Sequence, residues 1–383
     1  MSRAFSRRGF LLGSLAAAGY FGFPRPGRAA GKVSLQVEQI DTISHQRHNY
    51  HGWPTLARRK NGELLLVYSG GREAHVCPFG RVELMRSKDQ GQSWSWPRVL
   101  LDSPIDDRDS GVLETAKGTL LVTTFTSLAF EDFMARARFT RETYLRWSAA
   151  RDRISPLQRK QELGVWMLRS TDGGVTWSAR YDAQVNSPHG PIQLSDGRLL
   201  YAGKDLWRHR DRVEVCISQD DGRSWHRQAV IPPRDGDRAR NYHELHAVET
   251  ADGRIVCHIR NHNPKNYRET LQCESADGGR TWSKPRAIGV WGLPSHLLRL
   301  RDDTLLMSYG HRRKPFGVQA RISRDHGRTW SEPLVIYDQG TGGDLGYPST
   351  VELDDGSLLT VWYELRAGHP KAQLRQARWK LLR

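Results

Sequence analysis

Apolar and polar positions alternate along this chain in a pattern that occurs six times. Each copy is a polar turn, usually centred on Gly, followed by a run of Leu, Val or Ile, and the copies occupy residues 61–65, 117–121, 196–200, 252–256, 302–306 and 355–359. Successive copies begin 50 to 56 residues apart, except for one interval of 79. A period near 50 residues with one turn and one apolar strand is typical of four-stranded propeller blades. The pattern therefore predicts an all-β fold, a six-bladed β-propeller, over residues 32–383.

A second motif is interleaved with the first. Its form is Ser-x-Asp-x-Gly-x-Ser/Thr-Trp, and its five copies occupy residues 87–94, 170–177, 218–225, 275–282 and 323–330. The motif predicts a tight turn in which Asp binds the backbone two residues on, Gly adopts a conformation closed to other residues, and Trp packs beneath. It is similar to the Asp-box of the sialidase-like propellers. The sixth blade has no copy, as we expect for a blade closed by the two chain ends.

Two further segments, residues 32–40 and 372–382, also alternate and predict strands. We expect them to pair in one blade, because an open ring would leave sheet edges unpaired. Residues 129–163 account for the one long interval between copies, and their apolar positions recur at helical spacing. We expect a helical insertion there, which is a lid, a partner surface or a packing element on the rim.

The N-terminus predicts export. Arg7 and Arg8 precede Phe10 and an apolar run that ends near residue 23, which is the form of a twin-arginine signal peptide, here residues 1–31. The run is shorter than the roughly 20 apolar residues that a membrane span needs. The sequence thus predicts a periplasmic or secreted protein without a stable membrane span.

Composition limits the expected partners. The formal net charge is +16, and the five Arg of residues 1–30 leave +11 for the rest, which suits an anionic partner. Lys and Arg do not form a block interleaved with aromatic residues, so we expect no nucleic acid. The Cys residues lack C-x-x-C spacing, and the group of His45, His48 and His51 has helical spacing but precedes a strand. No metal or other cofactor is predicted.

The repeat also indicates where a site would form. The inner strands of a propeller converge on one channel, so equivalent residues of different blades meet there. Counting eight residues back from each turn gives one position per blade: Trp53, Asp109, Pro188, Glu244, Pro294 and Tyr347. Three of these are polar or ionisable, and His189 and His296 lie within two residues of the same level. Converging titratable groups at a channel mouth indicate a functional site.

Two stretches strengthen the resemblance to the exo-sialidases. Residues 243–261 resemble the Asn-Glu-x-x-Val-Val-Glu-x-x-Asp-Gly … Arg-Asn segment of that family, and residues 346–364 resemble the segment with its nucleophilic Tyr. The resemblance implies that Glu244 polarises Tyr347, the nucleophile. It also implies that Arg260 binds the substrate carboxylate. Sialidases use Tyr where most glycosidases use a carboxylate nucleophile.

The family binds the substrate carboxylate with three Arg. Residues 310–317 supply another of them, with Arg312 the first candidate and Arg313 the second. The remaining one is missing, because Gly52 aligns with it. Gly cannot provide a bidentate contact to a carboxylate. The nearby candidates to replace it are Arg47, Arg58 and Arg72.

The acid of the family also differs here. His75 stands where the family has its catalytic Asp, with Glu73 and Asp109 as rival acids. A His can donate or accept a proton near pH 7. We therefore expect an exo-acting glycoside hydrolase that releases a terminal, acidic sugar from a glycan. A His and a Tyr beside Arg could instead perform β-elimination on a uronic acid, and a non-catalytic glycan-binding propeller is the third hypothesis.

Overall fold

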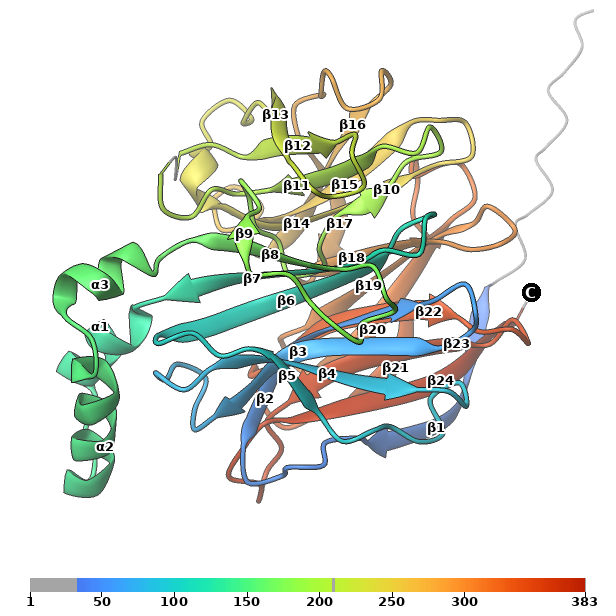
Figure 1. Cartoon of the computed structure of the whole chain (residues 1–383). Helices are drawn as coiled ribbons and strands as arrows, with labels where there is room; N and C mark the ends of the chain where they lie inside the picture. Colours follow the sequence, from blue (N-terminus) through green and yellow to red (C-terminus); the bar gives the residue numbers. More distant parts are fainter. Residues whose placement is uncertain (1–32, 209–210, 383) are drawn as a thin grey trace, which may run out of the picture. The chain divides into compact units, whose positions relative to one another are not determined.

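The computed structural model describes residues 33–208 and 211–382, and these form six antiparallel four-stranded sheets arranged as a β-propeller (Figure 1). Blade one is β2 (Tyr50–Arg58), β3 (Leu64–Arg72), β4 (Arg81–Ser87) and β5 (Arg98–Leu101). Blade two is β6 (Asp106–Glu114), β7 (Leu120–Ser127), β8 (Val165–Ser170) and β9 (Tyr181–Asp182). Blade three is β10 (Ile192–Gln193), β11 (Leu199–Gly203), β12 (Glu214–Ser218) and β13 (His226–Val230).

The second half of the ring follows the same order. Blade four is β14 (Tyr242–Glu249), β15 (Ile255–Asn261), β16 (Glu269–Ser275) and β17 (Arg286–Trp291). Blade five is β18 (Ser295–Arg299), β19 (Leu305–His311), β20 (Phe316–Ser323) and β21 (Leu334–Gly340). Blade six is β22 (Leu345–Glu352), β23 (Leu358–Glu364), β24 (Gln373–Leu382) and β1 (Ser34–Thr42). The prediction of six blades is confirmed.

The repeated apolar run forms the second strand of each blade. In β3 the run is continuous because both faces of the strand are covered. Leu64 and Leu66 belong to the core cluster shared with blade six, whereas Leu65 and Val67 belong to the cluster shared with blade two. All four are fully buried. Successive side chains of a strand point to opposite faces, so each blade packs on both of its neighbours.

The two ends of the described chain close the ring in blade six. β1 pairs antiparallel with β24, from Ser34 opposite Leu382 to Thr42 opposite Arg375. The prediction that these segments share a blade is confirmed.

The Asp-box joins the third and fourth strands of its blade. In the copy between β20 and β21, Asp325 accepts from the backbone of Thr329 at 2.9 Å and from the hydroxyl of Ser323 at 2.7 Å. Gly327 donates to that hydroxyl with a φ of +83°. The Asp therefore binds the backbone four residues on, so the prediction of two was wrong. The carboxylate spans the whole turn because the turn has four residues after the Asp.

The helical insertion is confirmed. Between β7 and β8 the chain forms α1 (Ala129–Arg136), α2 (Arg141–Asp152) and α3 (Pro156–Gln161). Figure 1 shows the three helices together beyond the ends of β6 and β7. Phe130, Met134 and Trp147 pack with Cys77 and Ile105 of the propeller in one buried cluster. The insertion thus packs on the propeller, as expected of a packing element.

The predicted export signal lies outside the described residues. Within residues 33–208 and 211–382, no helix has the length and apolar character needed to cross a bilayer.

Candidate active site

Four of the six equivalent inner-strand positions share an unusual backbone conformation. Trp53, Asp109, Glu244 and Tyr347 have φ of 53°, 44°, 35° and 52°, and each lies where the pairing of its strand shifts register. Positive φ is costly for residues other than Gly, and such bulges turn a side chain away from the ladder. Strain of this kind clusters at functional sites. The other two positions, Pro188 and Pro294, precede the short strands β10 and β18.

These bulges bring Tyr347 and Glu244 together although they lie 103 residues apart. The Tyr347 hydroxyl donates to Oε1 of Glu244, and Arg260 donates to Oε2. Arg260 also donates to the Tyr347 hydroxyl at 3.2 Å. The three side chains form one hydrogen-bonded group that we call the Tyr-Glu-Arg triad.

The triad fixes the charge of its members. Burial acts to raise the pKa of Glu244, but Arg260 and the hydrogen bond from Tyr347 outweigh it and lower that pKa. Burial, together with the negative charges of Glu244 and Asp109, raises the pKa of Tyr347 well above its usual value. The phenol is therefore neutral and its acceptor is ionised. This is the arrangement in which Glu244 can take the phenol proton as an attack develops.

Arg312 belongs to the same group of side chains. Its guanidinium carbon lies 5.4 Å from the ring centre of Tyr347, and its Nε donates to the Leu345 carbonyl at 2.7 Å. Among the described residues it has no carboxylate partner within ion-pair distance. Arg313 instead covers the ring of Trp291 at 4.5 Å and donates to His311. The structure thus brings Arg312 beside Tyr347 and directs Arg313 elsewhere.

A third guanidinium reaches the site from blade two. Arg108 lies 4.5 Å above the Trp53 ring, its Nε is buried without a hydrogen-bond partner, and its nearest carboxylate, Asp106, is 3.9 Å away. Sequence reasoning did not single out Arg108, because the resemblance pointed to an Arg in blade one. Its one sequence signal was its position beside Asp109.

Arg72 lies over the same Trp53 ring, with its guanidinium carbon 4.9 Å from the ring centre. It is fully buried and holds Asp106 with both guanidinium nitrogens, at 2.5 and 3.0 Å. It also donates to the backbone carbonyls of Ala74 and His75. Its donors are occupied inside the protein. Of the other two candidate replacements, Arg58 pairs with Asp354, and Arg47 is exposed on the loop before β2.

Asp109 lies beside the triad as a buried carboxyl. Only 6% of it is exposed, and its Oδ1 has no hydrogen-bond partner. Burial raises its pKa to about 7, with Arg108 opposing and Glu244 adding to the rise. Buried polar atoms without partners are rare and indicate a functional or ligand-binding role.

His75 lies on the rim in a cluster that the sequence did not reveal. Its Nδ1 is 2.8 Å from the Tyr50 hydroxyl and 3.0 Å from Oδ1 of Asp344. Tyr50 and Tyr363 both donate to the same carboxylate. Burial acts to raise the pKa of Asp344, but the hydrogen bonds, that of His75 first, outweigh it and lower that pKa. An ionised Asp344 places the proton of His75 on Nδ1, so Nε2 is the atom that can exchange a proton.

Trp53 connects this cluster to the triad. Its ring meets His75 edge-on at 5.0 Å, Tyr347 at 6.4 Å and Tyr363 at 5.9 Å between ring centres. The rival acid Glu73 is not part of the cluster, because its carboxylate is bound by Arg146 and Trp147 of the insertion.

His189 and His296 form a separate group with His246. Their ring centres lie 4.7 to 5.3 Å apart, and all three are buried. Burial lowers the pKa of each, so the imidazoles are neutral. His246 accepts the Leu297 amide at Nδ1, which leaves its proton on Nε2. No metal-binding group of three acidic, His or Cys residues occurs in the described part of the chain.

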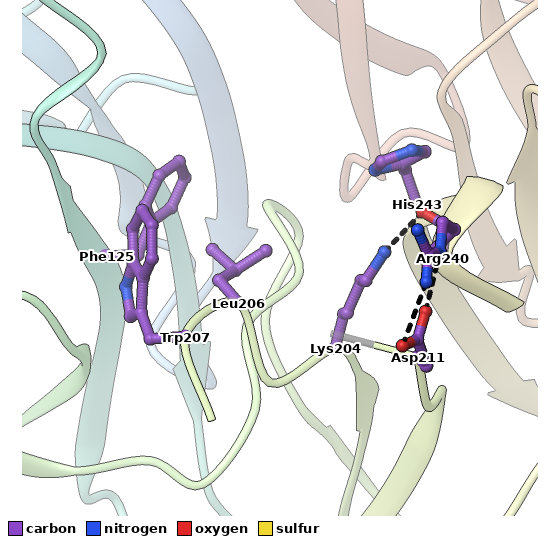
Figure 2. Close-up of a pocket in the computed structure, with 7 residues that line it drawn as sticks. All are labelled: Phe125, Lys204, Leu206, Trp207, Asp211, Arg240 and His243. Atoms are coloured by element: carbon purple, nitrogen blue, oxygen red, sulfur yellow. Dashed lines mark hydrogen bonds and ion pairs between the residues drawn. The ribbon is translucent and has the colours of Figure 1, made fainter. Parts of the chain in front are cut away.

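A side cavity of about 490 Å³ lies between blades two, three and four (Figure 2). Figure 2 shows an aromatic wall of Phe125 and Trp207 with Leu206 beside it, and polar side chains opposite. The polar wall consists of Lys204, Asp211, Arg240 and His243. His243 links this wall to the triad, since its ring packs at 5.0 Å on His262, which accepts from Arg260 at 2.9 Å. Sequence reasoning missed the cavity because blades two, three and four each contribute to it.

Comparison with known proteins agrees with this architecture. A model of the BNR repeat-like domain family matches residues 153–360. A sialidase from Bacteroides fragilis is 24% identical over 351 residues, with 82% of this chain and 60% of the relative covered. The chain thus spans less than two thirds of that relative.

Solved structures show the same fold. A protein of unknown function from Dyadobacter fermentans superposes with a TM-score of 0.74 at 23% identity, covering 91% of this chain and 100% of that chain. The Hadza microbial sialidase Hz136 superposes with a TM-score of 0.62 at 20% identity, covering 86% and 65%. With the family match over more than half of its length, the chain belongs to the BNR repeat-like domain family, within the superfamily of sialidase-like propellers.

Proposed function

We propose that this protein is an exo-acting glycoside hydrolase that releases a terminal acidic sugar from a glycan, with Tyr347 as nucleophile. One observation carries the proposal: Tyr347 and Glu244, at strained, equivalent positions of blades six and four, are hydrogen-bonded to each other and to Arg260 of blade four. Membership of a superfamily that includes sialidases supports a hydrolase-like role.

The first half of the reaction forms a covalent intermediate. The Tyr347 oxygen attacks the anomeric carbon while its proton passes to Glu244, and the bond to the leaving oxygen breaks. A neutral phenol suits this step, because a carboxylate nucleophile would repel the carboxylate of an acidic sugar. Arg260 stays beside both oxygens and balances the charge that moves from Glu244 to the phenol.

The leaving oxygen needs a proton, for which we assign His75. Burial lowers the pKa of His75, and Asp344, which holds Nδ1 of the imidazole, opposes this effect by stabilising the cationic form. It is the cationic form whose Nε2 gives its proton to the leaving group. In the second half a water attacks the anomeric carbon, His75 takes its proton, and the Tyr347 oxygen leaves with the proton held by Glu244. The enzyme returns to its starting state.

The acid group of the sugar is bound by guanidinium groups. We assign Arg260, Arg312 and Arg108 to this role. Arg108 would replace the family's Arg at the position where this chain has Gly52. The support for Arg108 is its buried, unpartnered Nε above Trp53. The side cavity provides room for further parts of the glycan, since an aromatic wall opposite polar side chains suits the apolar face and hydroxyl rim of a sugar.

The test begins with aryl glycosides of sialic and related nonulosonic acids, with uronides alongside. We expect release of the aryl group by the mature protein and its loss in Tyr347→Phe, with an unchanged melting temperature. Full activity of Tyr347→Phe would end the proposal. With a uronide that carries no aryl group, an unsaturated product that absorbs in the ultraviolet would identify a lyase. Retained glycan binding without turnover would identify a binding protein.

We also propose export to the periplasm or beyond through the twin-arginine signal of residues 1–31. Replacing Arg7 and Arg8 by Lys should retain the full-length chain in the cytoplasm, which cell fractionation measures. Unchanged export would refute this route.

A further inference from the structure

The loop that carries His75 joins β3 to β4, and we call residues 73–80 the acid loop. It is held from below by Arg72, whose guanidinium donates to the carbonyl of His75 at 2.9 Å and to that of Ala74 at 3.3 Å. Since Arg72 is itself fixed by Asp106 in blade two, the backbone at His75 is tied to the propeller.

The helical insertion holds the same loop from outside. Arg146 of α2 donates to both oxygens of Glu73, at 2.7 and 2.9 Å, and the indole of Trp147 donates to Glu73 at 2.8 Å. These partners lie more than 70 residues further along the chain. Burial acts to raise the pKa of Glu73, but these hydrogen bonds outweigh it and lower that pKa, so the carboxylate is ionised.

An apolar contact completes the attachment. Cys77 of the acid loop is fully buried with Phe130, Met134 and Trp147 of the insertion, and Ala74, Val76 and Phe79 pack at the edge of this cluster. The acid loop is thus attached at residues on both sides of His75. His75 itself stays accessible, with 47% of its side chain exposed.

We propose that the helical insertion is the scaffold that positions His75 against Tyr50 and Asp344, which makes Glu73, Arg146 and Trp147 positioning residues. The proposal rests on the acid role given to His75 in the proposed function. An acid works only when held within a fraction of an ångström of its productive geometry, by groups that do not themselves touch the substrate.

Two variants loosen the attachment while keeping the core filled. Glu73→Gln keeps the size of the side chain but loses the ion pair with Arg146. Trp147→Phe removes the indole donor and leaves an aromatic ring in the cluster. Arg151→Gln is the matched control, because Arg151 lies on the same helix and pairs with its neighbour Asp152.

The first measurement is independent of catalysis. Hydrogen–deuterium exchange of the peptide covering the acid loop, in the mature protein, should become about tenfold faster in Glu73→Gln and Trp147→Phe. It should not change in Arg151→Gln. Unchanged exchange in both loosened variants would overturn the proposal, whatever reaction the protein catalyses.

The second measurement distinguishes positioning from general stability. A 4-nitrophenyl glycoside has a leaving group that departs without a proton, whereas a methyl glycoside of the same sugar needs one. The loosened variants should lose about 10–100-fold in kcat/KM on the methyl glycoside and less than about threefold on the 4-nitrophenyl glycoside. Equal losses on both substrates, or none, would overturn the positioning role.

The same assay separates this inference from the proposed function. Tyr347→Phe should lose activity on both substrates together. Full activity in that variant would refute the proposed nucleophile, and the exchange measurement would then decide on the scaffold alone.

Discussion

Replacing Glu244 by Gln separates the chemical role of this carboxylate from its structural one. The side chain keeps its volume but loses the charge that accepts from Tyr347 and Arg260. Loss of a positioned general base should lower kcat about 10²–10⁴-fold. At about 1.36 kcal/mol for each factor of ten, the activation free energy would rise by about 3–5 kcal/mol.

Folding stability should change less. Arg260 keeps its hydrogen bonds to Tyr347 at 3.2 Å and to His262 at 2.9 Å. The Arg260 and Glu244 side chains are 16% and 17% exposed, so water reaches the pair. We expect the free energy of unfolding to fall by about 1–3 kcal/mol, the usual cost of a hydrogen bond to a charged group. Each kcal/mol should lower the Tm by no more than about 4 °C in a chain of this size.

Glu274→Gln is the matched control for this experiment. Glu274 lies in the same blade and accepts from Arg254 at 3.1 Å and Arg286 at 3.2 Å. Loss of the Glu274 charge should lower the free energy of unfolding by an amount comparable to that in Glu244→Gln and leave kcat unchanged. Steady-state kinetics and thermal unfolding of both variants give the comparison. If Glu244→Gln keeps more than about a tenth of the wild-type kcat, the carboxylate is not the base.

Three further predictions concern the third guanidinium, the side cavity and the buried imidazoles. Arg108→Gln should raise KM for an acidic glycoside about tenfold and leave KM for its neutral analogue unchanged, as measured by initial-rate kinetics. An equal change of KM for both substrates would exclude Arg108 from binding the acid group. Trp207→Ala should raise KM for an oligosaccharide more than for the methyl glycoside of the same sugar, and a uniform change would remove the cavity from glycan binding. His258 on β15 is a further buried imidazole. Burial lowers the pKa of His246 and His258 from 6.5 to about 3, so below pH 6.5 the unfolded chain binds more protons and stability should fall as the pH drops. Urea unfolding between about pH 7 and pH 5 measures this slope, His258→Gln should flatten it, and a slope of opposite sign would contradict the reasoning.

The propeller could be predicted because its signal is repeated. The run at Leu64 to Val67 is ambiguous alone, since a short apolar run fits a buried helix as well as a strand. Six copies at similar spacing remove the ambiguity. Counting back from the repeated turn located Asp109, Glu244 and Tyr347. The structure gives these positions the same backbone conformation because each inner strand bulges at the same level.

The missing parts of the site are those without a repeat. Asp344 contacts His75 across 269 residues, and Arg108 reaches Trp53 from the neighbouring blade. Arg72 was a candidate to bind the substrate carboxylate because it is close to Gly52 in the sequence. In the structure it forms a buried ion pair with Asp106. No local pattern distinguishes an Arg with a buried partner from an Arg without one.

The sequence by itself determined the number of blades, the closure of the ring by both chain ends, the place of the helical insertion and the inner-strand level of the candidate site. These features follow from local conformational preferences and from the spacing of the repeat, neither of which depends on contacts with other segments. Only the tertiary structure decided which charges are paired and which Arg beside Tyr347 has no carboxylate partner. It also decided which carboxylate binds His75, and that the helical insertion binds the acid loop. Such contacts depend on distances between segments far apart in the chain, and those distances exist only once the blades have packed.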